Sequence, residues 1–153
     1  ATKNRGLSGN IVISLLVGAV ILYGASAVGG FAQPVIWWIF GVVFLTNLAR
    51  EMVKDCMDME ADEGSRQTLP MTYGKEKVRM AAYVVIMGAL VCLYVPFWKG
   101  PFQFGQIALQ IPAILALITL NGPMVQGKDA LVAGRIRMAM LLGLVSFIAA
   151  SVL

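Results

Sequence analysis

The stretch MAAYVVIMGALVCLYVPFW, residues 80–98, contains no charged side chain. A transmembrane α-helix needs about 20 consecutive, predominantly apolar residues to cross the hydrocarbon core of a bilayer. The apolar residues follow one another in a block, without the strict alternation that is typical of a half-buried β-strand. This stretch therefore predicts a helix that spans a membrane.

Four further apolar segments flank this one. We expect spans at about 10–30, 34–49, 104–120 and 138–153, and Pro112 is expected to kink the fourth. Hydrophobic residues make up 59% of the 153-residue chain and charged residues only 13%. That balance leaves too little polar surface for a soluble domain of this size. The prediction is an all-α polytopic membrane protein, a bundle of five transmembrane helices.

The basic residues are distributed unevenly between the two ends of these spans. If the N-terminus is cytoplasmic, eleven of the twelve Lys and Arg side chains fall on the inner side and Lys99 falls outside. Cytoplasmic loops of membrane proteins carry such an excess of basic residues. We therefore expect a multi-pass cell-membrane protein with a cytoplasmic N-terminus and an external C-terminus. The net charge of +4 then reflects topology, and no nucleic-acid partner is expected.

The acidic residues are clustered in a way that topology does not require. Seven of the eight lie between Glu51 and Glu76. If a helix continues from the second span toward Gly64, its repeat of about 100° per residue places four carboxylates within an arc of about 60°. These four are Glu51, Asp55, Asp58 and Asp62. They would form one acidic stripe at the membrane surface.

Such a stripe has two interpretations. Aligned carboxylates repel one another, and a divalent cation would remove the repulsion. The chain has no histidine, so ligands that are all oxygen atoms favour a hard ion, Mg²⁺ or Ca²⁺. The spacing alone fits equally well with a solvated acidic helix balanced by Arg50 and Lys54.

Residues 50–62, REMVKDCMDMEAD, and the RQTLP string at 66–70 resemble the second aspartate-rich motif of the UbiA prenyltransferase family. The resemblance is strongest to the archaeal ether-lipid branch, where the motif reads roughly R-E-(I/V)-x-K-D-x-x-D-x-E-G-D, then R-T-L-P. Ala61 stands where that branch has glycine, but the carboxylates are intact. The KNRGLSGN string at 3–10 resembles the basic loop before the fifth family helix, and residues 138–147 resemble the last helix.

The resemblance implies a fold of nine transmembrane helices, of which this chain would supply the last five. Residues 1–153 would then be the C-terminal half of one prenyltransferase domain, with a cytoplasmic aspartate loop at about 50–78. The family's first motif, N-D-x-x-D-x-x-x-D, is absent from these residues. We expect an N-terminal half to carry it, either upstream or in a separate chain, and we expect this chain alone to be inactive.

The resemblance also implies the residues that act. Asp55, Asp58 and Asp62 would be the catalytic residues and would bind Mg²⁺, while Lys3 and Arg66 would contact the diphosphate. The implied reaction is the Mg²⁺-dependent transfer of a geranylgeranyl group from its diphosphate to a lipid acceptor, geranylgeranylglyceryl phosphate. Two alternatives stay open: an aromatic acceptor from quinone, haem or chlorophyll synthesis, and a non-enzymatic small membrane transport subunit. Transport favours an ionisable residue within a span, and the predicted spans contain none.

Overall fold

The computed structural model of the chain describes residues 6–64 and 67–153. The regular elements within these ranges are helices: α1 (Leu7–Ala27), α2 (Pro34–Asp58), α3 (Leu69–Tyr73), α4 (Lys75–Trp98), the 3₁₀ helix η2 (Phe104–Gln110), α5 (Ile111–Ile118), α6 (Asn121–Val125) and α7 (Asp129–Val152). Five segments, at 7–27, 34–58, 75–98, 104–125 and 129–152, are long and apolar enough to cross a membrane. The predicted all-α bundle of five long apolar helices is confirmed.

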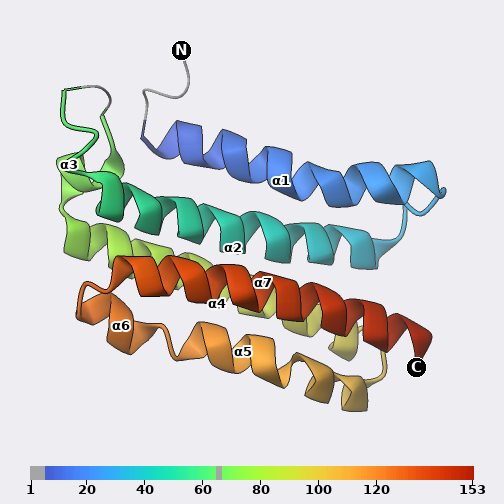
Figure 1. The fold of residues 1–153 in the computed structure, drawn as a ribbon. Coiled ribbons are helices and arrows are strands. Elements are labelled where there is room, and N and C mark those ends of the chain that lie inside the picture. The colour runs from blue at the N-terminus through green and yellow to red at the C-terminus, as the bar shows by residue number, and fades with distance from the viewer. Residues whose placement is uncertain (1–5, 65–66) are drawn as a thin grey trace.

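The long helices lie side by side and run antiparallel to the neighbours against which they pack (Figure 1). α2 packs against α1, α4 and α7, and α5 packs against α7. The larger hydrophobic core lies between α2, α4 and α7, where Val53, Ile86 and Ile136 are fully buried. α2 is therefore the central helix, and its last turn carries Asp55 and Asp58 of the predicted site.

α1 presents an apolar face outside this packing. Leu16, Val20 and Tyr23 are 67%, 65% and 79% exposed. A soluble protein rarely leaves such contiguous apolar surface in water. Lipid or further protein must therefore cover this side of the bundle.

The helices extend beyond the apolar segments that predict them. The second span is predicted at 34–49, but α2 continues to Asp58, and α7 begins at Asp129 rather than near residue 138. Charged residues occupy the added turns, because a helix keeps its own backbone hydrogen bonds after it leaves the apolar layer.

The motif helix is shorter than predicted. The sequence predicts a helix through Asp62, but α2 ends at Asp58 and residues 59–64 form turns. Negative charge is unfavourable at a helix C-terminus, and four acidic side chains fall between residues 58 and 63. This accumulation of carboxylates is a physical reason for the helix to end there.

The fourth span is not one kinked helix but the series η2, α5 and α6. Pro112 lies at the start of α5, a position where the missing N–H of proline has no intrahelical partner to lose. The expected kink is therefore a break between two helices.

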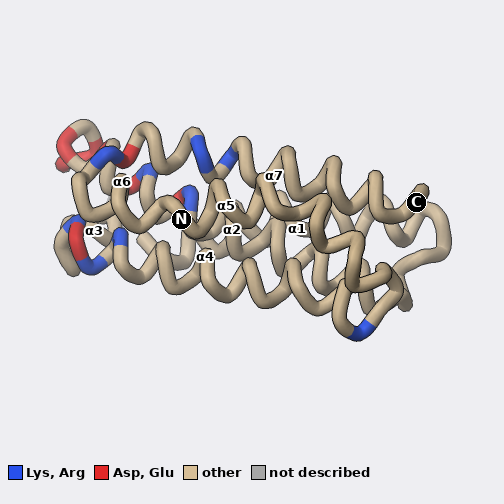
Figure 2. The backbone as a smooth tube through the Cα atoms, turned by 90° about the horizontal axis from the view of Figure 1, so that it is seen from below, with Lys and Arg blue, Asp and Glu red and all other residues tan. Residues whose placement is uncertain are grey.

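Charged residues gather at one end of the bundle (Figure 2). α1, α4 and α7 begin at this end and α2 ends there, whereas Lys99 follows α4 at the opposite end. The two ends thus differ in charge in the way that the sequence predicts, and the predicted site lies at the charged end.

Candidate functional site

Asp55 is held at the interface between α1 and α2. Its carboxylate is only 5% exposed, and Asn10, which is 6% exposed, lies across the interface on α1. Asn10 Nδ2 donates a hydrogen bond of 2.8 Å to Asp55 Oδ2. The antiparallel pairing brings the first turn of α1 beside the last turn of α2, so the contact joins residues 45 positions apart. This bond fixes the orientation of the carboxylate.

The polar contact continues one turn deeper into the apolar layer. Asn47 Nδ2 donates to Ser14 Oγ at 3.2 Å, and Ser14 Oγ donates to the backbone carbonyl of Asn10 at 2.7 Å. Both side chains are buried. Hydrogen bonds between polar side chains hold helices together where lipid replaces water. They secure the part of α1 that carries Asn10.

Glu51, one member of the acidic stripe, is paired with two basic side chains. Arg50 Nη1 donates to its Oε1 at 3.0 Å, and Lys54 Nζ lies 3.0 Å from its Oε2. The alternative interpretation, an acidic residue balanced by Arg50 and Lys54, thus applies to Glu51.

Asp58 and Asp62 lie nearer the surface. Asp58 is the last residue of α2 and Asp62 follows in the turns, and both are partly buried. The Asp62 backbone N–H donates to the Asp58 carbonyl at 2.9 Å. This bond preserves the four-residue spacing of a helix for one more turn, so the loop stays close to the end of α2.

The carboxylates of the motif are candidate ligands for a metal ion. Within 6–64 and 67–153, no group of three or more His, Cys, Asp and Glu side chains is arranged to hold a metal. A complete protein cage is therefore not formed by the described residues. Mg²⁺, however, is usually bound through one or two carboxylates together with substrate phosphates and water. Buried Asp55, with the partly buried Asp58 and Asp62 beyond it, fits that kind of shared binding.

Thr68 adds an unused hydroxyl to the same place. It is 2% exposed, and none of the described residues offers its Oγ1 a hydrogen bond. Together with Asn10 and Asp55 it lines a small cavity where α1, α2 and the segment before α3 meet. An unpartnered buried hydroxyl beside a carboxylate is a feature that a polar ligand would satisfy.

Some of the predicted site residues lie outside the described residues, and some residues found at the site were not predicted. Lys3 and Arg66 lie outside the described residues, so their diphosphate contacts stay predictions. The sequence did not single out Asn10 or Thr68, although both lie in the strings that carry the family resemblance. The available signal was a polar residue at the edge of an apolar span, which by itself has many explanations.

A second buried carboxylate lies at the same end of the bundle. Asp129, in the first turn of α7, accepts from Arg79 Nε and Nη2 at 2.7 Å each. This bidentate pair ties α4 to α7, and the Arg79 guanidinium also packs close to Gly127. The sequence predicts Arg79 as a topology anchor first and a phosphate contact second, and Asp129 as part of the same anchoring on the inner side.

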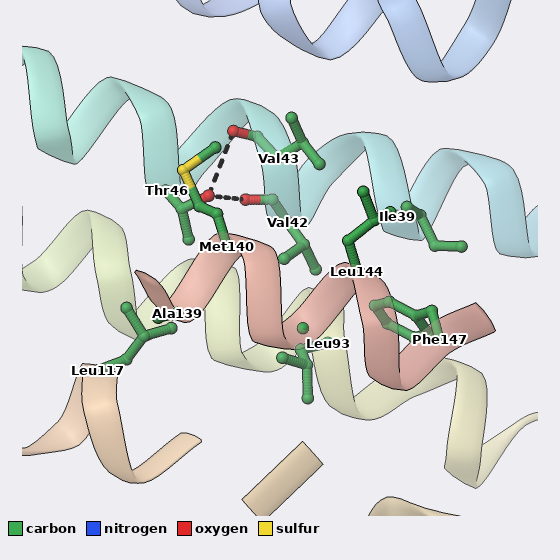
Figure 3. A pocket seen from close by; sticks show the side chains of 11 residues that line it. Ile39, Val42, Val43, Thr46, Leu93, Leu117, Ala139, Met140, Leu144 and Phe147 are labelled. Atoms are coloured by element: carbon green, nitrogen blue, oxygen red, sulfur yellow. Dashed lines mark hydrogen bonds between the residues drawn. The ribbon is translucent and has the colours of Figure 1, made fainter. Parts of the chain in front are cut away.

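A cleft between four helices of the bundle is apolar. Side chains from α2, α4, α5 and α7 line it, and its cavity volume is about 20 Å³ (Figure 3). Thr46 is the polar side chain that faces it, and its hydroxyl donates to the carbonyls of Val42 and Val43. A volume of this order holds about one water molecule, so in the described part of the chain this cleft has no room for an isoprenoid tail.

Two glutamines of the fourth span join it to α7. Gln106 Nε2 donates to the Ala150 carbonyl at 3.1 Å, and Gln110 Nε2 donates to the Gly143 carbonyl at 3.3 Å. They serve as interhelical contacts rather than as a lining of the site.

The fold and the charged end define a multi-pass membrane protein with an acidic site where its central helix leaves the apolar layer. Residues 1–129 match the model of the UbiA prenyltransferase family, so the chain belongs to that family. The family resemblance predicted from the aspartate motif is thereby confirmed.

Curated relatives give a closer comparison. The chain is 36% identical over 150 residues to the digeranylgeranylglyceryl phosphate synthase of Methanopyrus kandleri, a match that covers 96% of this chain and 55% of the relative. The corresponding synthase of Methanosarcina mazei is 31% identical over 156 residues, covering 96% and 52%. The chain spans about half the length of the curated relatives it matches. No solved structure matches the chain significantly.

Proposed function

We propose that the protein containing this chain transfers a geranylgeranyl group from its diphosphate to geranylgeranylglyceryl phosphate, in a reaction that depends on Mg²⁺. Family membership supports prenyl transfer, and the names of the similar proteins support the ether-lipid acceptor. The observation that carries the proposal is the buried Asp55 carboxylate, which Asn10 holds where α2 leaves the apolar layer.

The chemistry explains why carboxylates are needed at this point. Prenyl transfer breaks the C1–O bond of the prenyl diphosphate and forms a C–O bond to the acceptor hydroxyl, which releases its proton. The diphosphate leaves with the bonding electron pair. Bound Mg²⁺ supplies positive charge that stabilises such a leaving group. Asp55, Asp58 and Asp62 would hold the ion through oxygen, and Lys3 and Arg66 would contact the diphosphate.

These residues would form only one side of the complete site. The chain spans about half of its relatives, and it lacks the family's first aspartate motif. We infer that a further segment supplies that motif and faces the Asp55 side of the bundle. The 153 residues alone are expected to show no turnover.

The test uses the whole protein in detergent or proteoliposomes with radiolabelled geranylgeranyl diphosphate. Parallel reactions contain geranylgeranylglyceryl phosphate or 4-hydroxybenzoate as the acceptor. We expect the ether-lipid product in Mg²⁺, its loss in EDTA and its return when Mg²⁺ is restored. A prenylated aromatic product would replace the acceptor part of the proposal. No product with either acceptor would overturn prenyl transfer.

We also propose that the charged end of the bundle faces the cytoplasm, because basic residues are retained on that side. Single-cysteine variants at positions 99 and 128, made after replacement of Cys56 and Cys92, test the orientation in intact cells. A membrane-impermeant maleimide should label position 99 directly and position 128 only after permeabilisation. The reverse pattern would invert the topology.

A further inference from the structure

Thr68 stands out because the fold buries its hydroxyl without using it. The residue is 2% exposed, and its Oγ1 has no hydrogen-bond partner among the described residues. Leaving a buried donor or acceptor unsatisfied destabilises the folded state. Native proteins usually satisfy such groups, so the hydroxyl calls for a partner beyond the described residues.

Thr68 does not play the role that threonine normally has at this position, which is to cap the start of a helix with its hydroxyl. Thr68 precedes α3 as its N-cap residue, where a threonine side chain normally accepts a hydrogen bond from a backbone N–H of the first turn. Pro70 lies in that turn and has no N–H to donate, and Thr68 makes no side-chain cap bond. The Thr68 hydroxyl therefore does not cap α3.

The surroundings of Thr68 indicate what the partner is. Thr68, Asn10 and Asp55 line one cavity of about 10 Å³. A cavity of about 10–15 Å³ accommodates one water molecule, which is the size of a single ligand oxygen atom. On the Asp55 side of the cavity, Asn10 already fixes the carboxylate through Oδ2. A threonine hydroxyl can donate to a phosphate oxygen, or accept from a cation-bound water molecule, while Asp55 holds the cation.

We propose that Thr68 is a ligand-positioning residue whose hydroxyl forms a hydrogen bond with one oxygen of the metal–diphosphate unit bound at Asp55. The hydroxyl either donates to a diphosphate oxygen or accepts from a water molecule of the hydrated cation. The identity of the ligand rests on the proposed function. The presence of an unsatisfied hydroxyl beside Asp55 is independent of the proposed function.

The substitution Thr68→Val separates this role from a structural one. Valine keeps the shape of the side chain and removes a buried polar group that has no partner, so the protein without ligand should be as stable as the wild type or more stable. Loss of one hydrogen bond to a charged ligand should weaken ligand binding about tenfold. Thr68→Ser should restore binding because it restores the hydroxyl, and Thr68→Ala provides a second hydroxyl-free variant in case valine disturbs the fold.

The measurement is binding to the whole purified protein in detergent, by calorimetry and by the ligand-induced increase in melting temperature. The probes are Mg²⁺ alone, and inorganic pyrophosphate in saturating Mg²⁺. If the oxygen is a cation-bound water, Thr68→Val weakens the binding of Mg²⁺ alone. If it is a phosphate oxygen, only pyrophosphate binding weakens. Thr46→Val is the matched control, because it removes a buried hydroxyl that already has backbone partners on α2, and it should leave both affinities unchanged.

The outcomes also distinguish this inference from the proposed function. Wild-type affinities in Thr68→Val and Thr68→Ala, or failure of serine to restore them, would overturn the role of Thr68 while prenyl transfer stands. A wild-type protein that binds neither probe would overturn the role as well. A protein that binds Mg²⁺ and pyrophosphate with the expected Thr68 dependence, yet transfers no prenyl group, would leave the inference standing and refute the proposed reaction.

Discussion

Asp55 and Asp129 are both buried carboxylates at the charged end of the bundle, with 5% and 7% of their surface exposed. Asp129 lies in the first turn of α7, where the helix dipole favours a negative charge, and both of its oxygens accept from one guanidinium. Asp55 lies in the last turn of α2, where the dipole opposes a negative charge. Its Oδ2 accepts from the neutral amide of Asn10.

The difference separates two uses of a buried charge. Asp129 has the position and the partner that stabilise a carboxylate, so it serves to lock α4 against α7. Asp55, with Asp58 beside it at the end of α2, is placed where the helix itself disfavours negative charge. A cation bound there would relieve that cost, which is what a site for a metal–diphosphate ligand requires. Substitutions at Asp55 and at the partner of Asp129 test this difference between the two carboxylates.

The largest effect is expected on activity when Asp55 is changed to asparagine in the whole protein. The amide keeps the shape of the side chain but not the charge that holds a cation, so kcat/KM for prenyl transfer should fall about 100- to 1,000-fold. The unfolding free energy should change by about 1 kcal/mol or less, because the dipole penalty is also removed. Initial rates and denaturant titrations measure the two effects. Near-wild-type rates in the Asp55→Asn protein would show that the charge of Asp55 does not hold a cation needed for the reaction.

The next largest effect is expected on stability when Arg79 is changed to methionine. The buried Asp129 carboxylate would lose its partner, and because the pair is only partly buried the loss should be about 1–3 kcal/mol, below the range for fully buried pairs. Equilibrium unfolding in detergent measures the loss. The double variant Arg79→Met with Asp129→Leu should recover most of the stability, because no unpaired charge then stays buried. A loss below about 1 kcal/mol in the single variant, relative to the range for buried pairs, would show that this pair is not a lock.

A smaller effect is expected when Asn10 is changed to alanine. The variant removes the hydrogen bond that orients Asp55, and loss of such a supporting contact lowers metal affinity by about tenfold or more. The half-saturating Mg²⁺ concentration of the reaction should rise accordingly, with a smaller change in the maximal rate. Asn47→Ala is the control, because Asn47 bonds Ser14 on the same helix interface. It should alter stability but not the Mg²⁺ dependence, and an equal Mg²⁺ shift in both variants would indicate a general loosening of α1.

The smallest effect is expected when Gln110 is changed to methionine. Gln110 is fully buried and bonds the Gly143 carbonyl, but its Oε1 has no partner among the described residues. Interhelical polar contacts in membranes contribute about 0.6 kcal/mol on average, and removing an unsatisfied oxygen offsets part of that. The unfolding free energy should therefore change by less than about 1 kcal/mol. A larger loss would mean that buried amides stabilise this bundle as strongly as its ion pair.

Much of the fold could be predicted from the sequence because its signals are local. Apolar blocks long enough to span a bilayer, such as residues 80–98, specify helices almost without regard to their neighbours. The ends of the helices could not be predicted as well. The end of α2 at Asp58 and the break before α5 depend on charge at a helix terminus and on where neighbouring helices pack, and neither is visible in an apolar pattern.

The candidate site divides in the same way. The acidic stripe is readable from spacing, and Asp55, Asp58 and Asp62 stay its predicted metal ligands. The helical spacing alone gives no reason to treat Glu51 differently from Asp55, yet the structure pairs Glu51 with Arg50 and Lys54 and buries Asp55 against Asn10. Partners 45 residues apart come together only after α1 and α2 have packed.

The sequence by itself determined that the chain is an apolar helical bundle with its charges at one end and its carboxylates in one motif. Composition and local periodicity suffice for that, because bilayer thickness and the helical repeat are fixed lengths. The packing of the helices decides which carboxylate is paired with arginine, which accepts from an amide, and which buried hydroxyl has no partner among the described residues. These assignments depend on contacts between residues distant in the chain, and such contacts are set by helix packing rather than by the order of residues along any one helix.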